Sequence, residues 1–266
     1  MSQRRAGRPP DRSALREHLV AHRIAGAVAT PRENNLRNIV RMCDRQEGWT
    51  FGLAVDHEWT TDEVFEVMVE RVGIDPDPSR TEGPDSIDPG RTIERLDAMA
   101  ERLSRAAVDR QRVMVATGHP AGVLAVHAAV AAAIEAAGAT LVTPAAGWSY
   151  RTNAGAHREI RWVGGVGMVS NRGELNHTHS PRAMEAALAA LRNHAEAPPD
   201  LVIADHGWAG AAGHAGIDTV GFADCNDPAL FVGEAEGKIS VAVPLDDNVL
   251  PHLYAPLTAY LLRDVR

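Results

Sequence analysis

The chain has 266 residues, of which 45% are hydrophobic and 23% are charged, and its formal net charge is −8 at pH 7. This balance is typical of a globular protein and indicates one domain with an N-terminal elaboration. An acidic chain has no broad basic surface, so we do not expect nucleic acid as a partner. Positive charge gathers only at Arg4, Arg5, Arg8 and Arg12, and we interpret residues 1–12 as a disordered leader.

The cysteines and the apolar runs exclude two further classes of protein. Cys43 and Cys225 lie far apart and form no C-x-x-C pair, which argues against a disulfide framework and a cysteine-based zinc site. The longest apolar run, residues 123–137, is too short and too polar for a membrane span. The N-terminus lacks the apolar segment of a signal peptide. We therefore expect a cytoplasmic protein without membrane contact.

The first hundred residues are predicted to be mostly helical. A helix is expected over residues 13–28, and the helical pattern resumes at 36–42. Thr61 and Asp62 begin another helix that continues to Val72. Residues 73–90 are rich in Pro, Asp, Ser and Gly and predict a loop. The apolar spacing from Ile93 to Ala107 then predicts a further helix.

From residue 112 onward, short apolar strands alternate with helices. A strand at 113–116, a turn at 117–120, a helix at 121–137 and a strand at 141–142 form a βαβ unit. Further segments are expected as a hairpin or edge strands at 160–176, helices at 180–191 and 257–262, and strands at 201–204, 219–223 and 239–243.

These elements predict an α/β fold with a three-layer, Rossmann-like, mostly parallel sheet and an N-terminal helical elaboration. In the single domain 13–266, residues 13–110 would be the helical part and residues 111–266 the sheet core that carries the site. Ligands of such sheets bind beyond the carboxyl ends of the strands. The motifs at these strand ends are therefore the candidates for function.

The first candidate is a glycine turn between a strand and a helix. A ligand can approach backbone N–H groups there, and the helix N-terminus favours an anion. The turn matches neither a dinucleotide fingerprint nor a Walker A loop, and a plain strand-to-helix turn is the alternative. We assign phosphate binding to Thr117, Gly118, His119 and Gly122.

The polar segment 30–35, expected between two helices, could add further phosphate ligands. Arg32 could donate two hydrogen bonds to a phosphate, and Asn34 lies beside it in the sequence. A structural cap is the alternative interpretation of this segment.

Two histidines precede a predicted helix cap. His177 and His179 point the same way if the segment is extended, which suits two ligands of one metal or an anion clamp. The alternative interpretation is two surface histidines.

Asp205 and His206 follow an apolar strand, a usual place for a metal ligand, a nucleophile or a general base. A loop cap is the alternative for Asp205.

The densest group of carboxylates follows the strand at 219–223. Asp224, Asn226, Asp227 and Glu234 offer hard oxygen ligands, which suit Mg²⁺ with a phosphate substrate. The run 246–248, Asp-Asp-Asn, follows the last strand and supplies a third strand end of the same chemistry. Cys225 is a poor nucleophile, because the aspartates on both sides disfavour its thiolate.

These motifs resemble an actinobacterial family that is labelled phosphatase. The resemblance rests on ATGHPAGVL (116–124), LVTPAAGWSYR (141–151), HTHSP (177–181), the glycine- and aspartate-rich run 204–237, and VPLDDNV (243–249), together with TPRENN (30–35) and HLYAPLTAYLL (252–262). It covers nearly the whole chain and implies hydrolysis of a small phosphorylated metabolite. A more distant analogy links Asp224-Cys225-Asn226 and Gly233-Glu234 to the metal-dependent damage-control phosphatases.

The favoured interpretation is a phosphomonoesterase that depends on a divalent metal, Mg²⁺ before Mn²⁺ or Zn²⁺. Asp205, Asp224 or Asp227 would hold the metal, and one aspartate, or a water deprotonated by His206, would attack phosphorus. His177 or His179 would protonate the leaving group. A sugar or polyol phosphate is the preferred substrate.

Two alternatives stay open. One is a ligand-binding module for a phosphorylated ligand or nucleotide, without turnover. The other is a metal-dependent lyase or amidohydrolase, which Zn²⁺ or Fe would favour. The sequence does not exclude a homo-oligomer.

Overall fold

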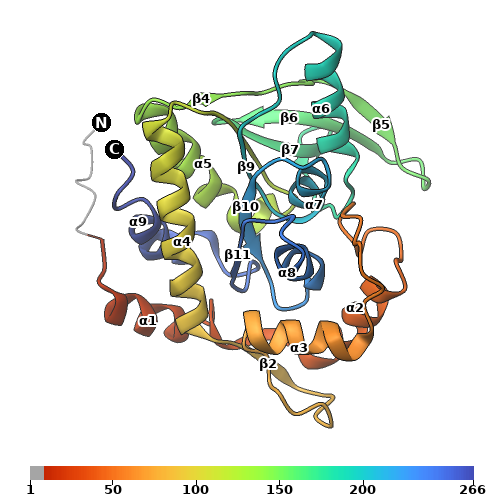
Figure 1. Ribbon diagram of the computed structural model, residues 1–266, viewed down its shortest axis with the longest axis vertical. Helices are drawn as coiled ribbons and strands as arrows, with labels where there is room; N and C mark the ends of the chain where they lie inside the picture. The colour runs from red at the N-terminus through yellow and green to blue at the C-terminus, as the bar shows by residue number, and fades with distance from the viewer. Residues whose placement is uncertain (1–8) are drawn as a thin grey trace.

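The computed structural model describes residues 9–266 and shows a mixed α/β protein (Figure 1). The helices are α1 (Arg12–Ala21), α2 (Arg32–Cys43), α3 (Thr61–Arg71), α4 (Pro89–Val108), α5 (Pro120–Ala136), α6 (Arg182–Asn193), α7 (His206–His214), α8 (Pro228–Ala235), η1 (Pro251–Tyr254) and α9 (Ala255–Leu261). The strands are β1 (Gly26–Pro31), β2 (Pro84–Ile87), β3 (Arg112–Ala116), β4 (Thr140–Leu141), β5 (Ser149–Arg151), β6 (His157–Val163), β7 (Val166–Asn171), β8 (Glu174–Leu175), β9 (Leu201–Ile203), β10 (Thr219–Ala223) and β11 (Val241–Pro244).

The central sheet is mostly parallel in its core and antiparallel toward one edge. Its strand order is β11-β10-β9-β3-β7-β6-β5, with β4 paired to β3 and β8 paired to β7. The strands from β11 to β3 run parallel, as do the pairs of β3 with β4 and β7. The strands β5, β6 and β8 are antiparallel to their neighbours. This confirms the predicted α/β fold with a mostly parallel sheet, whereas the finer Rossmann-like description stays a prediction.

Helices lie on both sides of the parallel strands. On one side, α4 packs against β11 and α5 against β3 and β7. On the other side, α7 packs against β9 and β10 and α8 against β11 (Figure 1). One hydrophobic cluster joins the two sides of the sheet. It extends from Leu15 in α1 to Leu261 in α9 and thus includes the N-terminal helices. Trp208 is fully buried at the start of α7. This rigid core holds the strand ends in place and with them the polar loops that follow.

The prediction of a helix over residues 13–28 is wrong beyond Ala21. The chain turns at Gly26, whose φ of +81° is a backbone conformation that glycine adopts readily, and continues as β1. β1 pairs antiparallel with β2, which lies inside the predicted loop 73–90. This small separate sheet delivers Thr30 to the candidate site described below.

The predicted leader lies mostly outside the described residues, which begin at residue 9. Its last residue, Arg12, already belongs to α1, and the Asp11 side chain caps that helix by accepting from the backbone N–H of Ala14. Among residues 9–266, no helix combines the length and the apolar character that a bilayer span requires.

The side chain of Glu236 joins the end of α8 to the loop before α3. Its carboxylate accepts hydrogen bonds from the backbone N–H groups of Asp56 and His57 and from Nε1 of Trp59, and pairs with Lys238. Burial by itself would raise the pKa of Glu236, but Lys238, Trp59 and the two backbone groups outweigh burial and lower the pKa to about 2.

This lowered pKa predicts a stability effect that depends on pH. A carboxylate with a depressed folded-state pKa stabilises the protein above its unfolded value of 4.5 and loses this contribution as the pH falls toward about 2. We expect Glu236→Gln to lower Tm by roughly 2–4 °C at pH 7 and the gap to wild type to narrow below pH about 4.5. Thermal unfolding at several pH values measures this, with exposed Glu82→Gln as control. An equal gap at every pH would contradict it.

Candidate functional site

Polar side chains from several strand ends meet in one pocket of about 310 Å³. The pocket collects residues from β1 and from the segments after β3, β8, β9, β10 and β11, in the region that open α/β sheets use for ligands. The pocket is lined by Ala29, Thr30, Pro31, Asn34, His119, His177, His179, His206, Asp224, Asn226, Asp227, Asp246, Asp247 and Asn248. The structure thus brings together most of the histidines and aspartates that the sequence predicted, with Asn34 and Asn226.

His206 stands at a sharp turn between β9 and α7. Its φ of +48° lies in the left-handed region, an uncommon conformation for a residue with a side chain. Such strain persists only where the surrounding structure enforces it, and it recurs at functional sites. Gly118 makes the enforcement possible, because a Cβ there would lie 2.8 Å from Cβ of His206 and 2.6 Å from the carbonyl oxygen of Thr178. The turn therefore holds the buried imidazole in one fixed place.

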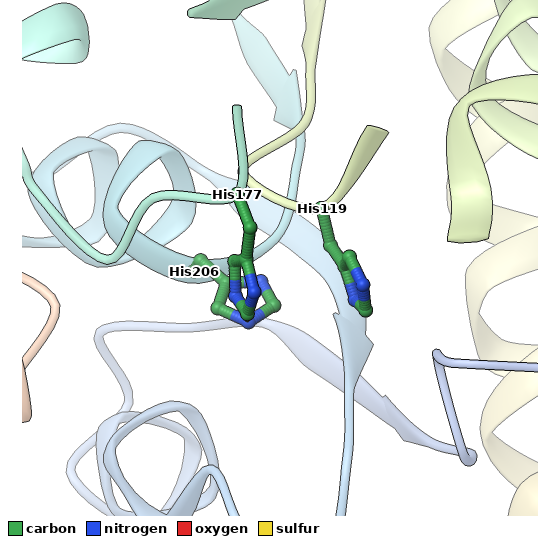
Figure 2. A group of neighbouring side chains, drawn as sticks. All are labelled: His119, His177 and His206. Atoms are coloured by element: carbon green, nitrogen blue, oxygen red, sulfur yellow. The ribbon is translucent and has the colours of Figure 1, made fainter. Parts of the chain in front are cut away.

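Three imidazoles and one carboxylate, here called the histidine cluster, converge beside this turn: His177, His179, His206 and Asp227. Nε2 of His177 lies 3.2 Å from Nε2 of His206 and 3.2 Å from Nε2 of His179. Nε2 of His206 lies 3.5 Å from Oδ2 of Asp227. Figure 2 shows the rings of His177 and His206 side by side, one from the segment before α6 and the other from the start of α7.

Hydrogen bonding alone does not explain this convergence. A neutral imidazole nitrogen carries either one hydrogen or one lone pair, so Nε2 of His177 cannot form ordinary hydrogen bonds to both neighbouring nitrogens. Donors bound to one metal at about 2.0–2.1 Å in a tetrahedron are separated by roughly 3.3 Å. The separations between neighbouring donors, 3.2, 3.2 and 3.5 Å, match that spacing. Ligand atoms of His179, His206 and Asp227 all lie within 4.8 Å of one another, as do those of His119, His177 and His206.

A second group, here called the acidic cluster, consists of Asp224, Asp246 and Asp247. Each offers a carboxylate oxygen, and these oxygens all lie within 4.8 Å of one another. All three side chains are buried. Hydroxyl Oγ1 of Thr30 donates to Oδ2 of Asp224 at 2.7 Å, which fixes that carboxylate from the side of β1. Three buried oxygen donors of this kind suit a hard cation.

His119 and Asp247 connect the two clusters. Nδ1 of His119 lies 3.0 Å from Oδ2 of Asp247, yet this buried nitrogen has no hydrogen-bond partner of good geometry among residues 9–266. His119 precedes α5, and its ring stacks on that of His177 with 4.4 Å between the ring centres (Figure 2). Oδ2 of Asp247 also lies 3.8 Å from Nε2 of His206. Asp247 therefore faces both clusters.

The site holds more buried charge than its own groups neutralise. Burial would lower the pKa of His206, but Asp227 and Asp205 outweigh burial and raise it to about 10. Burial and the neighbouring charge of His206 lower the pKa of His177 to about 4. Burial and the crowded carboxylates raise the pKa of Asp224 well above its usual range. A divalent cation among these groups would stabilise the ionised carboxylates and the neutral imidazoles together.

Asp205 lies behind His206 and outside the pocket lining. Its Oδ1 lies 2.9 Å from Nδ1 of His206 and accepts from the backbone N–H groups of Gly118 and His119. An Nδ1–H bond to this carboxylate leaves the lone pair of Nε2 facing the histidine cluster. The geometry makes Asp205 a positioning residue and does not place it as the direct metal ligand or nucleophile that the sequence suggested.

The anion expected at the glycine turn is thus the protein's own carboxylate. The N–H groups of Gly118 and His119 bind Asp205, and Thr117 is fully buried outside the pocket lining, so these groups are not available to a phosphate. Gly122 has a packing role, because a Cβ there would lie 1.8 Å from the carbonyl oxygen of Asp247. From this segment, the His119 side chain reaches the pocket.

The structure does not bring Arg32 and Glu234 to the site. Arg32 is fully buried and pairs at 2.9 Å with Asp85, a buried carboxylate of β2. Glu234 pairs with Arg71 at 2.7 Å and with Arg95 at 3.6 Å. Both ion pairs support the fold, because a buried charge is costly to leave without a partner.

Other residues of the site were missed or undervalued by sequence reasoning. Thr30 lay in a segment expected to connect two helices, and His127 lay in an apolar run. Nε2 of His127 is buried 3.6 Å from Oδ2 of Asp205. The aspartates after β11 stood out as a strand-end motif, and this signal could have placed them among the ligands. Cys225 is buried, and burial with Asp224 raises the pKa of its thiol, as expected.

The fold and the site together define an α/β protein with a histidine and aspartate centre at the carboxyl ends of its parallel strands. A family model described as Phosphatase matches residues 10–266, which is nearly the whole chain. The chain is also similar to the protein named Phosphatase SCO2771 from Streptomyces coelicolor, with 48% identity over 257 residues that cover 96% of each chain. The chain therefore belongs to the phosphatase family, as the resemblance of its motifs implied.

Proposed function

We propose that this protein is a phosphomonoesterase that binds two divalent cations, one at the histidine cluster and one at the acidic cluster. The observation that carries the proposal is the spacing of three imidazole nitrogens and one carboxylate oxygen, whose neighbouring separations are 3.2, 3.2 and 3.5 Å. Two overlapping groups of three of the site's residues offer ligand atoms within 4.8 Å of one another. Membership of the phosphatase family supports hydrolysis of a phosphate ester over binding without turnover and over lyase or amidohydrolase chemistry. A pocket of about 310 Å³ suits a small substrate.

The two clusters differ in the metal that they favour. Imidazole ligands suit Zn²⁺, Mn²⁺ or Fe²⁺, whereas an all-carboxylate set suits Mg²⁺ or Mn²⁺. His177, His179, His206 and Asp227 would hold the first cation, and Asp224, Asp246 and Asp247 the second. The magnesium site predicted from the sequence shares only Asp224 with the acidic cluster, for which we propose Mg²⁺ or Mn²⁺. Mn²⁺ is the metal that suits both clusters.

Metal ions in such a site supply charge neutralisation of the phosphate and a nucleophilic oxygen at neutral pH. The chain itself contributes the fixed positions of the donors. Asp205 orients His206, and Thr30 orients Asp224, so neither ligand has to reorganise when substrate arrives. Rings of Trp49 and Phe51 contact His179 edge-on at 5.1 and 4.9 Å and shield that side of the histidine cluster from water.

Phosphate release and metal content test the proposal together. The purified protein should contain about two divalent metal ions per chain and release inorganic phosphate from a panel of sugar and polyol phosphates. Chelation should lower the rate by more than about 100-fold, and separate addition of Mn²⁺, Zn²⁺ and Mg²⁺ should show which metal restores it. Full activity in the metal-free protein would overturn the metal sites. If no ester released phosphate with any of the added metals, the proposed hydrolysis would be overturned.

A further inference from the structure

A second pocket opens beside the candidate site. It has a volume of about 320 Å³ and shares His177 with the first pocket, so the two are contiguous. Three parts of the chain form it: the loop after α2, the β5–β6 hairpin and the segment that leads into α6. Its lining residues are Glu47, Tyr150, Thr152, Asn153, Ala154, Arg158, His177, Thr178, Ser180 and Arg182.

Two guanidinium groups give this second pocket its character. Arg158 is half-buried and donates one hydrogen bond, from Nη1 to its neighbour's carbonyl oxygen. Arg182 is exposed, and its guanidinium lies 5.4 Å from the centre of the Tyr150 ring. Within residues 9–266, neither forms an ion pair with a carboxylate, although Glu47 also lines the pocket. A guanidinium has five N–H donors, so most of theirs remain free to bind an anion.

The charge of this pocket contrasts with its surroundings. The chain carries a net charge of −8, and the first pocket is lined by four aspartates. Two arginines beside such a centre would repel the cations that we place there unless an anion lay between them. If the phosphate of a substrate lay at the metal clusters and its alcohol portion extended past His177, an anionic group on that portion would enter the pocket that the two arginines line.

The groove continues beyond Arg182 into a third pocket of about 560 Å³. Tyr150 and Arg182 line both pockets, and Trp148, which is 39% exposed, adds a further aromatic face. The rest of its lining is Ala145 and, from α6, Glu185, Ala186, Ala189, Ala190 and Asn193. The second pocket is therefore open at its far end and can accept leaving groups of different length.

We propose that Arg158 and Arg182 form a subsite for a second anionic group on the leaving-group side of the substrate. The preferred substrates are then phosphomonoesters that also carry a carboxylate or another phosphate. This inference rests on the proposed phosphatase function and narrows its substrate class. Charge-assisted and bidentate hydrogen bonds make arginine suited to both groups.

Matched substrate pairs test the subsite. The pairs are glycerol 3-phosphate against 3-phosphoglycerate, which adds a carboxylate, and adenosine 5′-phosphate against adenosine 3′,5′-bisphosphate, which adds a phosphate. In at least one pair, the wild-type enzyme should show about 10–100-fold higher kcat/KM for the member with the second anion, the range expected for hydrogen bonds to a charged group. The pair that responds identifies which anion the subsite binds.

Arginine variants connect that preference to the subsite. In Arg158→Gln and Arg182→Gln, the kcat/KM ratio within the responding pair should fall about tenfold or more, toward unity. Arg192→Gln is the matched control, since Arg192 is an exposed residue in the last turn of α6 and does not line the pocket. It should keep the wild-type ratio.

The outcomes separate this inference from the proposed function. Phosphate release at equal rates from both members of each pair would overturn the subsite and leave the phosphatase standing. A preference that survives in both arginine variants would also overturn the subsite. Failure to hydrolyse any ester would overturn the proposed function itself.

Discussion

Replacing His206 with alanine should lower kcat/KM for phosphate release by roughly 1,000-fold or more and remove the metal of the histidine cluster. His206 contributes the nitrogen that lies near His177, Asp227 and Asp247 at once. Its loss therefore removes a donor, and without the cation that it would help to hold, the buried carboxylates face no positive charge. Steady-state kinetics and metal analysis of the purified variant measure both effects.

A control on the same helix separates chemistry from folding. His214 is exposed in the last turn of α7, and His214→Ala should keep wild-type rates and metal content. His206→Asn should be as inactive as the alanine variant but nearer to wild type in Tm, because asparagine tolerates the left-handed backbone of this position. Wild-type activity in either His206 variant would show that the histidine cluster is not the reactive centre.

Replacing Asp247 with asparagine should lower kcat by about 100- to 1,000-fold and reduce the bound metal from two ions to one per chain. Asp247 belongs to the acidic cluster, and its Oδ2 also faces His119 and His206. An amide keeps the size of the carboxylate but not its charge, so the second cation loses a ligand while the histidine cluster stays complete. Metal stoichiometry against added Mn²⁺ measures the loss directly.

The matched control for this variant lies away from the pocket. Asp109 is an exposed aspartate that follows α4, before β3 begins, and Asp109→Asn should bind metal and release phosphate as wild type does. If Asp247→Asn retained two tightly bound metals, the acidic cluster would not be a cation site. If it lost both metals together, the two clusters would form one interdependent centre and the separate assignment would be wrong.

Part of the site followed from the sequence because its signals are local. Apolar runs separated by helical segments indicate parallel strands, and the carboxyl ends of parallel strands meet at one edge of a sheet. Asp224 follows such a run directly, and His206 and Asp227 come a few residues after one. Their common location was therefore predictable without knowledge of any contact, and the structure places them in one pocket.

The errors concern residues whose partners lie far away in the chain. Arg32 offered a plausible phosphate ligand, but it pairs with Asp85 from β2, a strand that lies inside a predicted loop. Glu234 was close in sequence to the aspartates, but α8 turns it toward Arg71 and Arg95. Ion pairing depends on which elements pack together, and local spacing does not carry that information.

By itself, the sequence determined the α/β alternation, the edge of the sheet where the polar groups gather, and the family to which the chain belongs. Only the tertiary structure decided the role of each group. It placed Asp205 behind His206 and not at a metal-ligand position, because the backbone N–H groups of the glycine turn donate to that carboxylate. It also placed Nε2 of His177 3.2 Å from Nε2 of His206. Ring orientation and donor spacing arise from packing between segments, and neither is written in the spacing of residues along the chain.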